Sequence, residues 1–200
     1  MIEWINLSIL FLSLFLFCYF YTLSIQPVKR EEKRGDIAWK ECTFFRYLSW
    51  FFNLIIGISF ILWMWFPIPF LNWKIHSDYL VCFLIGVVFS IPFLMLLLKS
   101  MKDAGSESLH PSKKTTMYRG IYNYIRHPQI LGEFPLFVTG AFIVNSWFLL
   151  LLMIVFVLVY TPIMIYYEEK DLLRRFGDDY RDYQKRTGAL FPVIRKKANL

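Results

Sequence analysis

The sequence predicts an all-α, polytopic integral membrane protein with about five transmembrane helices. Of its 200 residues, 57% are hydrophobic and 20% are aromatic, and the mean hydropathy is +0.46. That is too apolar for an ordinary soluble domain of this length. The apolar residues gather in separate segments, and the basic residues gather in the loops between them.

Five apolar segments each approach the roughly 20 helical residues that cross a hydrocarbon core. Their approximate bounds are 4–25, 44–66, 78–98, 130–146 and 147–167. The first segment lacks a basic leading region and a small-x-small cleavage site, so we expect it to be retained as a span. Only Asn145-Ser146 interrupts the last two segments. This pair predicts the tight turn of a helical hairpin, because about 38 residues is too long for one span.

The distribution of charge predicts the orientation of these spans. The chain has 22 Lys and Arg against 15 Asp and Glu. Five alternating spans place every basic residue except Lys74 on one side, which is then cytoplasmic, with the N-terminus outside and the C-terminus inside. Basic loops between apolar spans favour membrane lipids as a partner rather than nucleic acid. No obligate protein partner is evident.

The spans divide the chain into two regions. Residues 1–98 hold the first three transmembrane helices, and residues 99–200 form a predicted catalytic region. The catalytic region combines a cytoplasmic loop, the hairpin 130–167 and an amphipathic tail, which we expect to break at Gly177. The three cysteines show no metal-binding spacing, so no metal site is predicted and the cysteines are expected to pack in the interior.

The segment that leads into the hairpin carries the first candidate site. His127-Pro128 stands where the fourth apolar helix should begin, and proline is favoured at the first helical position. The next residues, from Gln129 onward, would offer free backbone N–H groups, which makes a helix start a natural site for an anion. The alternative is an interfacial Arg-His pair that binds lipid phosphate.

The pair Glu168-Glu169 forms the second candidate site at the far end of the hairpin. Antiparallel packing would bring these carboxylates to the same membrane face as His127. A ligand that carries both signs of charge suits such a site, and S-adenosylmethionine fits, because it has a carboxylate, an ammonium, a sulfonium and a ribose diol. A carboxylate can hold its ammonium or its ribose hydroxyls. The alternative is that the two glutamates are simply the first residues beyond the membrane.

Glu133 lies one turn into the same predicted helix as Gln129. An ionisable group inside a span is a candidate functional residue, here for contact with the substrate. The sequence lacks the glycine-rich dinucleotide motif, the Walker loop, His-Glu-x-x-His and Gly-x-Ser-x-Gly. Their absence argues against soluble dinucleotide-binding, nucleotide-hydrolysing, zinc-protease and serine-hydrolase proteins.

Taken in order, several short motifs resemble those of the isoprenylcysteine carboxyl methyltransferase family and its phospholipid-methylating relatives. The resemblance covers roughly residues 110–194. It rests on Gly120-Ile121-Tyr122, Arg126-His127-Pro128 with Gly132, Glu168-Glu169, Phe176-Gly177-Asp178-Asp179-Tyr180-Arg181-Asp182-Tyr183 and Phe191-Pro192. It implies a membrane-embedded methyltransferase that uses S-adenosylmethionine as cofactor and methylates a lipidic or small hydrophobic acceptor.

The resemblance also assigns roles to residues. It implies that the cofactor contacts are Lys114, Thr115, Thr116, Met117, Tyr122, His127, Pro128, Gln129, Ile130 and Glu168. Glu169 is then a candidate catalytic base or substrate contact. Members that act on prenylcysteine carry an arginine four residues before the acidic ligand, where this chain has Met164. Met164 shares a helix face with Glu168 and is expected to contact the substrate, so a thiol, amine or lipid acceptor becomes plausible.

Two other functions stay open on the sequence. Membrane sterol reductases, which use NADPH, carry a similar Arg-His-Pro segment followed by Gly-Glu, and Gly132-Glu133 matches that version. A small lipid-binding membrane protein without enzymatic activity would use the same basic face to hold anionic headgroups.

Overall fold

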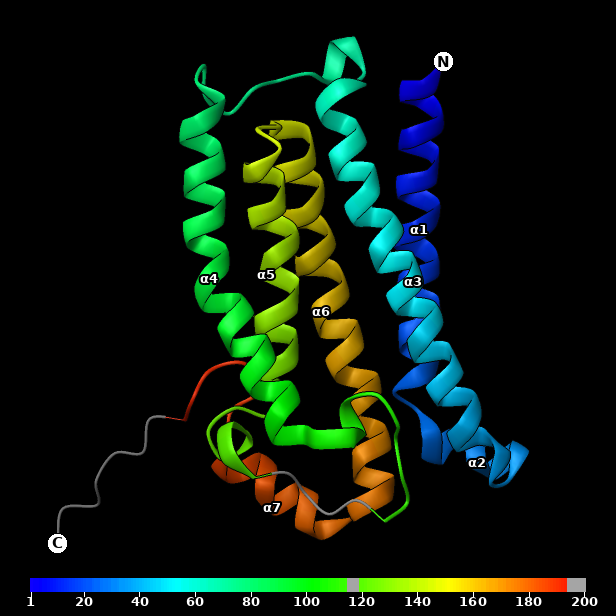
Figure 1. Cartoon of the computed structure of the whole chain (residues 1–200). Coiled ribbons are helices and arrows are strands. Elements are labelled where there is room, and N and C mark those ends of the chain that lie inside the picture. The colour runs from blue at the N-terminus through cyan, green and yellow to red at the C-terminus, as the bar shows by residue number, and fades with distance from the viewer. Residues whose placement is uncertain (115–118, 194–200) are drawn as a thin grey trace, which may run out of the picture.

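The computed structural model describes residues 1–114 and 119–193, and it is a bundle of long helices with most of its short helices at one end (Figure 1). The elements, in order, are α1 (Ile2–Ser24), α2 (Pro27–Arg34), α3 (Ile37–Trp65), η1 (Pro69–Leu71), α4 (Tyr79–Ala104), η2 (Gly105–Ser108), η3 (Gly120–Asn123), α5 (Pro128–Ile143), α6 (Trp147–Phe176) and α7 (Asp178–Arg186). The described part of the chain has no named β-strand, so the all-α prediction is confirmed.

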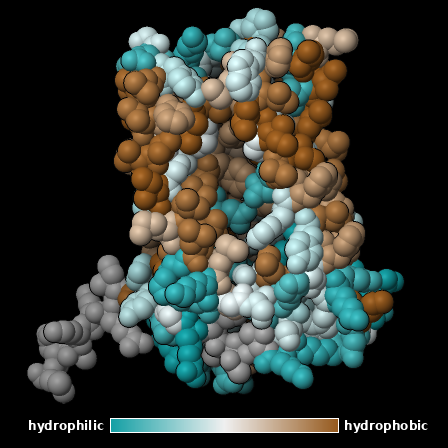
Figure 2. Space-filling model, viewed as in Figure 1, coloured by the Kyte–Doolittle hydropathy of each residue, from teal (hydrophilic) through white to brown (hydrophobic). Residues whose placement is uncertain are grey.

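The long helices agree with the five predicted spans in number and order. Four stretches of the described chain are long and apolar enough to cross a membrane, and α5, with 16 residues, is apolar but shorter. These lengths and compositions support a multi-pass membrane protein. Large apolar side chains are exposed along α1, α3, α4 and α6, and Figure 2 shows hydrophobic residues over the middle of the face in view. Exposed apolar surface of this extent is typical of helices that face lipid.

Two predicted helix bounds need correction. α3 begins at Ile37 rather than near 44, and α6 continues to Phe176 rather than ending near 167. The extension of α6 consists largely of Glu, Lys, Leu and Arg, which are good helix formers. Its basic residues Arg174 and Arg175 also lie in the last turn, where positive charge interacts favourably with the helix dipole. Glu168 and Glu169 therefore lie inside a helix and not after it. The predicted break at Gly177 is confirmed.

The predicted hairpin turn is confirmed between α5 and α6. Asn145 has φ 57°, a left-handed conformation that asparagine tolerates better than most residues. Its side chain accepts a hydrogen bond from the backbone N–H of His76 at 3.0 Å and donates to the His76 carbonyl at 2.9 Å. The Ser146 hydroxyl accepts a bond from the backbone N–H of Leu149 and caps α6. The turn is thus also tied to the loop between α3 and α4.

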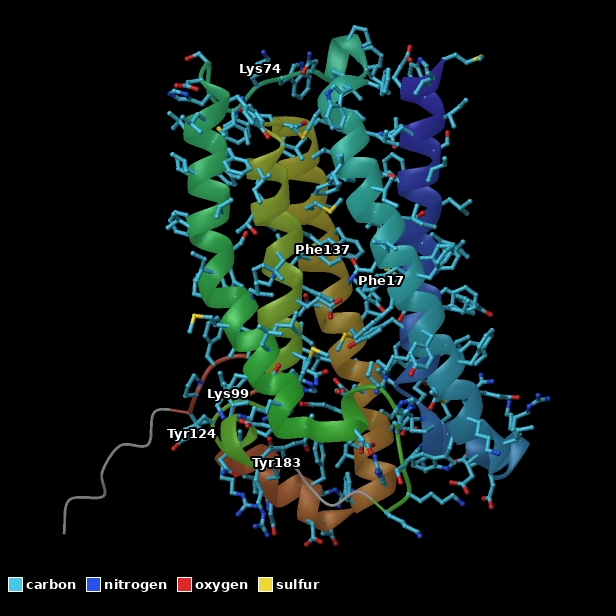
Figure 3. All side chains as sticks on the ribbon, in the orientation of Figure 1. Phe17, Lys74, Lys99, Tyr124, Phe137 and Tyr183 are labelled. Atoms are coloured by element: carbon cyan, nitrogen blue, oxygen red, sulfur yellow. The ribbon has the colours of Figure 1, made fainter. Side chains whose placement is uncertain are left out.

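Aromatic side chains join α1 to the hairpin in the core. The rings of Phe17 and Phe137, labelled in Figure 3, have centroids 6.0 Å apart, and Phe134 stacks on Tyr160 at 5.8 Å. The Tyr160 hydroxyl donates to the backbone carbonyl of Cys18 at 3.0 Å, so this buried polar group is satisfied. Cys42 and Cys82 are buried, and Cys18 is partly so, and all three are free thiols, as expected for packing residues.

Gly132 allows α5 to lie against α4. A Cβ atom added there would stand 2.6 Å from the backbone nitrogen of Leu97, a distance that only a shift of the backbone could relieve. The close approach fixes the position of the first turns of α5, which carry the predicted site. Gly132 is therefore a packing residue of this helix pair.

Whereas η1 lies at the same end of the bundle as the N-terminus, the short helices α2, η2, η3 and α7 lie at the opposite end (Figure 1). This end, which we term the basic end, carries α2, the loop 105–114 and α7. Lys99 and Tyr183 lie toward it, whereas Lys74, the exception in the charge count, lies at the opposite end (Figure 3). The helices thus separate the basic residues as the sequence predicts. The side of a membrane that the basic end faces stays a prediction.

Candidate functional site

The start of α5 is held in place by the segment that follows α7. The backbone N–H groups of Arg126 and His127 donate to the carbonyls of Gly188 and Ala189 at 2.9 and 3.0 Å. Gly188 permits this pairing, because a Cβ atom there would lie 1.8 Å from the Phe191 carbonyl oxygen. His127 has extended φ with ψ 59° ahead of Pro128, which opens the helix as predicted. The tail therefore fixes the backbone of the predicted anion site.

His127 lies between the two glutamates of α6. Its Nδ1 is 2.8 Å from a Glu168 oxygen and its Nε2 is 3.0 Å from a Glu169 oxygen, and only 4% of the residue is exposed. Burial lowers the pKa of His127, but the negative charge of Glu168, with hydrogen bonds to both carboxylates, outweighs burial and raises it to about 9. An imidazolium that donates from both nitrogens satisfies this geometry. The hairpin thus brings the two halves of the predicted site together.

Glu169 is fully engaged by its neighbours. One of its oxygens accepts from Arg126 Nε at 2.8 Å and contacts His127, and the other accepts from Gln184 Nε2 at 2.9 Å. Arg126 in turn donates to the backbone carbonyls of Gln184 and Thr187. The geometry therefore favours a role for Glu169 in positioning His127 and the tail, rather than the catalytic role that the sequence suggested.

A cavity, which we term the polar cavity, opens beside His127 at the basic end. Seven of the predicted site residues line it: Tyr122, His127, Pro128, Gln129, Ile130, Met164 and Glu168. Helix geometry leaves the N–H groups of Gln129 and Ile130 without intrahelical partners. The Glu168 side chain is 31% exposed, although one oxygen contacts His127. An anion-binding helix start and a carboxylate thus face one space.

Three of the six remaining predicted residues stand elsewhere, and the other three lie outside the described part of the chain. Lys114 is exposed and does not line the polar cavity. Glu133 lines a second cavity, described below. Glu169 lies behind His127. Thr115, Thr116 and Met117 fall outside the described residues.

Several residues that line the polar cavity were not identified from the sequence. They include Tyr21, Arg46, Glu107 and Arg175. Arg175 Nη1 pairs with a Glu107 oxygen at 2.7 Å, and these side chains are 8% and 5% exposed. Arg46 donates to the backbone carbonyls of Glu107 and Ser108 at 2.9 Å. These residues come from segments that only the fold brings together, so no local motif identifies them. Tyr180, which also lines the cavity, belongs to the tail motif that resembles the family, but the sequence did not assign it a role in the site.

Some buried polar atoms of residues that line the cavity lack a hydrogen-bond partner in the described part of the chain. The Tyr180 hydroxyl and the Nε atoms of Arg46 and Arg175 are buried, and among the described residues no hydrogen-bond partner satisfies them. Such atoms are rare in folded proteins and call for a ligand or ordered water. Together with Glu168 and the α5 start, they suit a ligand with both charges and hydroxyl groups. The described residues contain no cluster of side chains that could hold a metal ion.

Comparison with known families decides which ligand chemistry to consider. A family model described as phospholipid methyltransferase matches residues 79–179, half of the chain. The chain belongs to this family. The matched region runs from α4 to the start of α7 and includes Tyr122, His127 and Glu168. The family assignment agrees with the resemblance found in the sequence.

Two curated relatives are methanethiol S-methyltransferases. The chain is similar to methanethiol S-methyltransferase 1 of Bradyrhizobium diazoefficiens, with 27% identity over 151 residues, which cover 68% of the chain and 51% of the relative. It is also similar to methanethiol S-methyltransferase of Pseudomonas deceptionensis, with 30% identity over 157 residues, which cover 72% and 57%. The chain thus spans only a little over half the length of these relatives. No solved structure matches it significantly.

Proposed function

We propose that this protein is a membrane-embedded methyltransferase that moves the methyl group of S-adenosylmethionine to the sulfur of a hydrophobic thiol. Membership of the phospholipid methyltransferase family and the names of the two relatives support this assignment. The observation that carries it is the polar cavity, where the start of α5 and Glu168 face one space. A reductase or a simple lipid-binding protein gains no support from the comparisons.

The residues around the polar cavity fit the proposed cofactor. The free N–H groups at Gln129 and Ile130 suit its carboxylate, and Glu168 suits its ammonium or its ribose hydroxyls. Tyr122 and Tyr180 provide aromatic surface for a base, and the unpartnered Tyr180 hydroxyl can bond to it. When bound, the cofactor supplies a sulfonium whose methyl group is already activated. The protein then has to orient the acceptor and exclude water.

The cavity walls must move to admit such a ligand. The polar cavity holds about 80 Å³, which is small for a nucleoside derivative. The loop 105–114 and α7 form part of its wall through Glu107 and Tyr180. Opening by these surface segments would leave the hairpin unchanged. With the basic end in the cytoplasm, as the charge distribution predicts, the cofactor would reach the site from the cytosol.

Substitution of Glu168 tests this assignment. Loss of a charge-assisted hydrogen bond costs about 1.5–3 kcal/mol, so Glu168→Ala should weaken the binding of S-adenosylmethionine roughly 10- to 100-fold. Isothermal titration calorimetry on the purified full chain in nanodiscs gives the dissociation constant. Glu32→Ala is the matched control, because Glu32 is an exposed carboxylate at the same end and does not line the cavity.

Two results would overturn the proposal. Unchanged affinity in Glu168→Ala would remove Glu168 from the cofactor site. Binding of NADPH by the wild-type chain, with no binding of S-adenosylmethionine, would favour the reductase instead. Transfer of a labelled methyl group to an alkanethiol is the direct assay of activity.

A further inference from the structure

A second cavity, which we term the apolar chamber, lies between α3, α4 and α5. It holds about 680 Å³, far more than the polar cavity. Most of its walls are apolar, among them Leu54, Ile61, Leu136 and Phe137. Figure 2 shows a hollow on this face of the bundle, with hydrophilic atoms in its depth. The chamber is thus an apolar space with a polar floor.

The apolar chamber and the polar cavity border each other. Tyr21, Arg46, Ser108 and Gln129 line both. The side chain of Arg46 therefore stands at their boundary, held by backbone carbonyls on its two sides. A molecule in the chamber would have one end next to the ligand of the polar cavity.

Asn53 and Glu133 form the polar pair of the chamber. Asn53 Nδ2 of α3 donates to Glu133 Oε1 of α5 at 3.0 Å, and both residues line the chamber. Among the described residues, no cation forms an ion pair with Glu133. A carboxylate has about four acceptor positions, so one amide bond leaves capacity unused. An ionisable group in an apolar span is costly to keep without a partner.

We propose that Glu133, held by Asn53, binds and deprotonates the thiol head of the methyl acceptor, while the chamber holds an alkyl chain much longer than the single methyl of methanethiol. This inference rests on the proposed function and deepens it by naming the acceptor class. The volume supports a long chain, because methanethiol would leave most of 680 Å³ unfilled. The apolar walls favour a hydrocarbon body by about 0.8 kcal/mol for each buried methylene.

The chemical step balances within this arrangement. The thiol donates a hydrogen bond to the Glu133 carboxylate. As the acceptor sulfur forms its bond to the methyl carbon, the bond from that carbon to the sulfonium sulfur breaks and its electron pair stays on the departing sulfur. The acceptor proton passes to Glu133, and the products are a thioether and S-adenosylhomocysteine.

Glu133→Gln separates this role from a structural one. A glutamine carbonyl can still accept the bond from Asn53, so the contact between α3 and α5 is preserved while the base is removed. We expect kcat for octanethiol to fall at least tenfold, with the KM for octanethiol raised and the affinity for S-adenosylmethionine within twofold of wild type. Unchanged kinetics would overturn the proposal. A loss of cofactor affinity equal to that of Glu168→Ala would assign Glu133 to the cofactor site instead.

Chain length tests the chamber itself. Wild-type kcat/KM should rise several-fold with each methylene from methanethiol to octanethiol, as the transfer free energy predicts. Gly57→Leu should flatten this rise and lower kcat/KM for octanethiol far more than for methanethiol, because Gly57 lines the chamber and no atom lies within 4 Å of an added Cβ. Val88→Phe on the exposed face of α4 is the control. Independence of chain length in the wild type would overturn the assignment of the chamber.

Binding measurements distinguish failure of the inference from failure of the proposed function. Octanethiol binding to the full chain is measured in nanodiscs without turnover, for wild type and Gly57→Leu. Binding that Gly57→Leu abolishes, with no methyl transfer to any thiol, would reject the proposed function and keep the chamber as a binding site. Methyl transfer with octanethiol binding that is equal in both proteins would reject the chamber and keep the function.

Discussion

The polar cavity and the apolar chamber differ in how their charged side chains are paired. Around the polar cavity, charged groups meet partners from distant parts of the chain, as in the pairs Arg175–Glu107 and His127–Glu168. In the chamber, the Glu133 carboxylate accepts a hydrogen bond from the neutral amide of Asn53 and has no ion-pair partner among residues 1–114 and 119–193. The first arrangement builds a frame that stabilises the closed cavity, because each buried charge is compensated. The second leaves a reactive group available in an apolar space.

The largest effect should come from the frame of the polar cavity. Arg175→Met removes the cation that pairs with the buried Glu107 carboxylate, and breaking a buried pair in this way costs about 3–5 kcal/mol. We expect a large drop in melting temperature of the detergent-solubilised protein. Arg174→Met is the matched control, since Arg174 contacts the exposed Glu32 at 3.5 Å and such pairs contribute less than about 1 kcal/mol. Equal effects in both variants would show that the buried pair does not stabilise the frame.

The pH dependence of stability tests the central histidine. The folded-state pKa of His127 is about 9, above its ordinary value of 6.5. The protonated His127 side chain therefore stabilises the folded state fully below pH 6.5, and this stabilisation is lost as the pH rises through about 9. At 1.36 kcal/mol for each pH unit, the wild type should lose about 3 kcal/mol more than His127→Gln over this range. Thermal unfolding from pH 6 to pH 10 measures the difference, and parallel curves would contradict the assigned charge.

A smaller effect is expected where α5 contacts α4. Gly132→Ala places a Cβ atom against the backbone of Leu97, and overpacking of this kind costs about 1–3 kcal/mol. In Gly57→Ala the added methyl group meets no atom within 4 Å, so helix propensity should make that variant neutral or slightly more stable. Melting temperatures of the two variants give the comparison. A Gly132→Ala protein as stable as Gly57→Ala would mean that the helices can separate without cost.

The local sequence was sufficient to predict three features of the backbone. The helix start at Pro128, the turn at Asn145 and the break at Gly177 each follow from the backbone preferences of one or two residues. The continuation of the last apolar span into the tail as one helix, α6, could not be predicted in this way. Hydropathy marks where apolar residues stop, whereas the helix itself continues through Glu168 and Glu169 because charged residues with long side chains also favour helix.

The sequence by itself determined the class of protein, the hairpin and the meeting of His127 with the glutamates. Apolar segment lengths and one short turn leave antiparallel helices little freedom, so residues at their common end must be neighbours. Only the tertiary structure decided which of these groups face a cavity. It placed Glu169 behind His127 and Glu168 at the cavity wall. It also joined Asn53 to Glu133 across 80 residues, because packing between helices depends on their rotation and crossing, which no local pattern encodes.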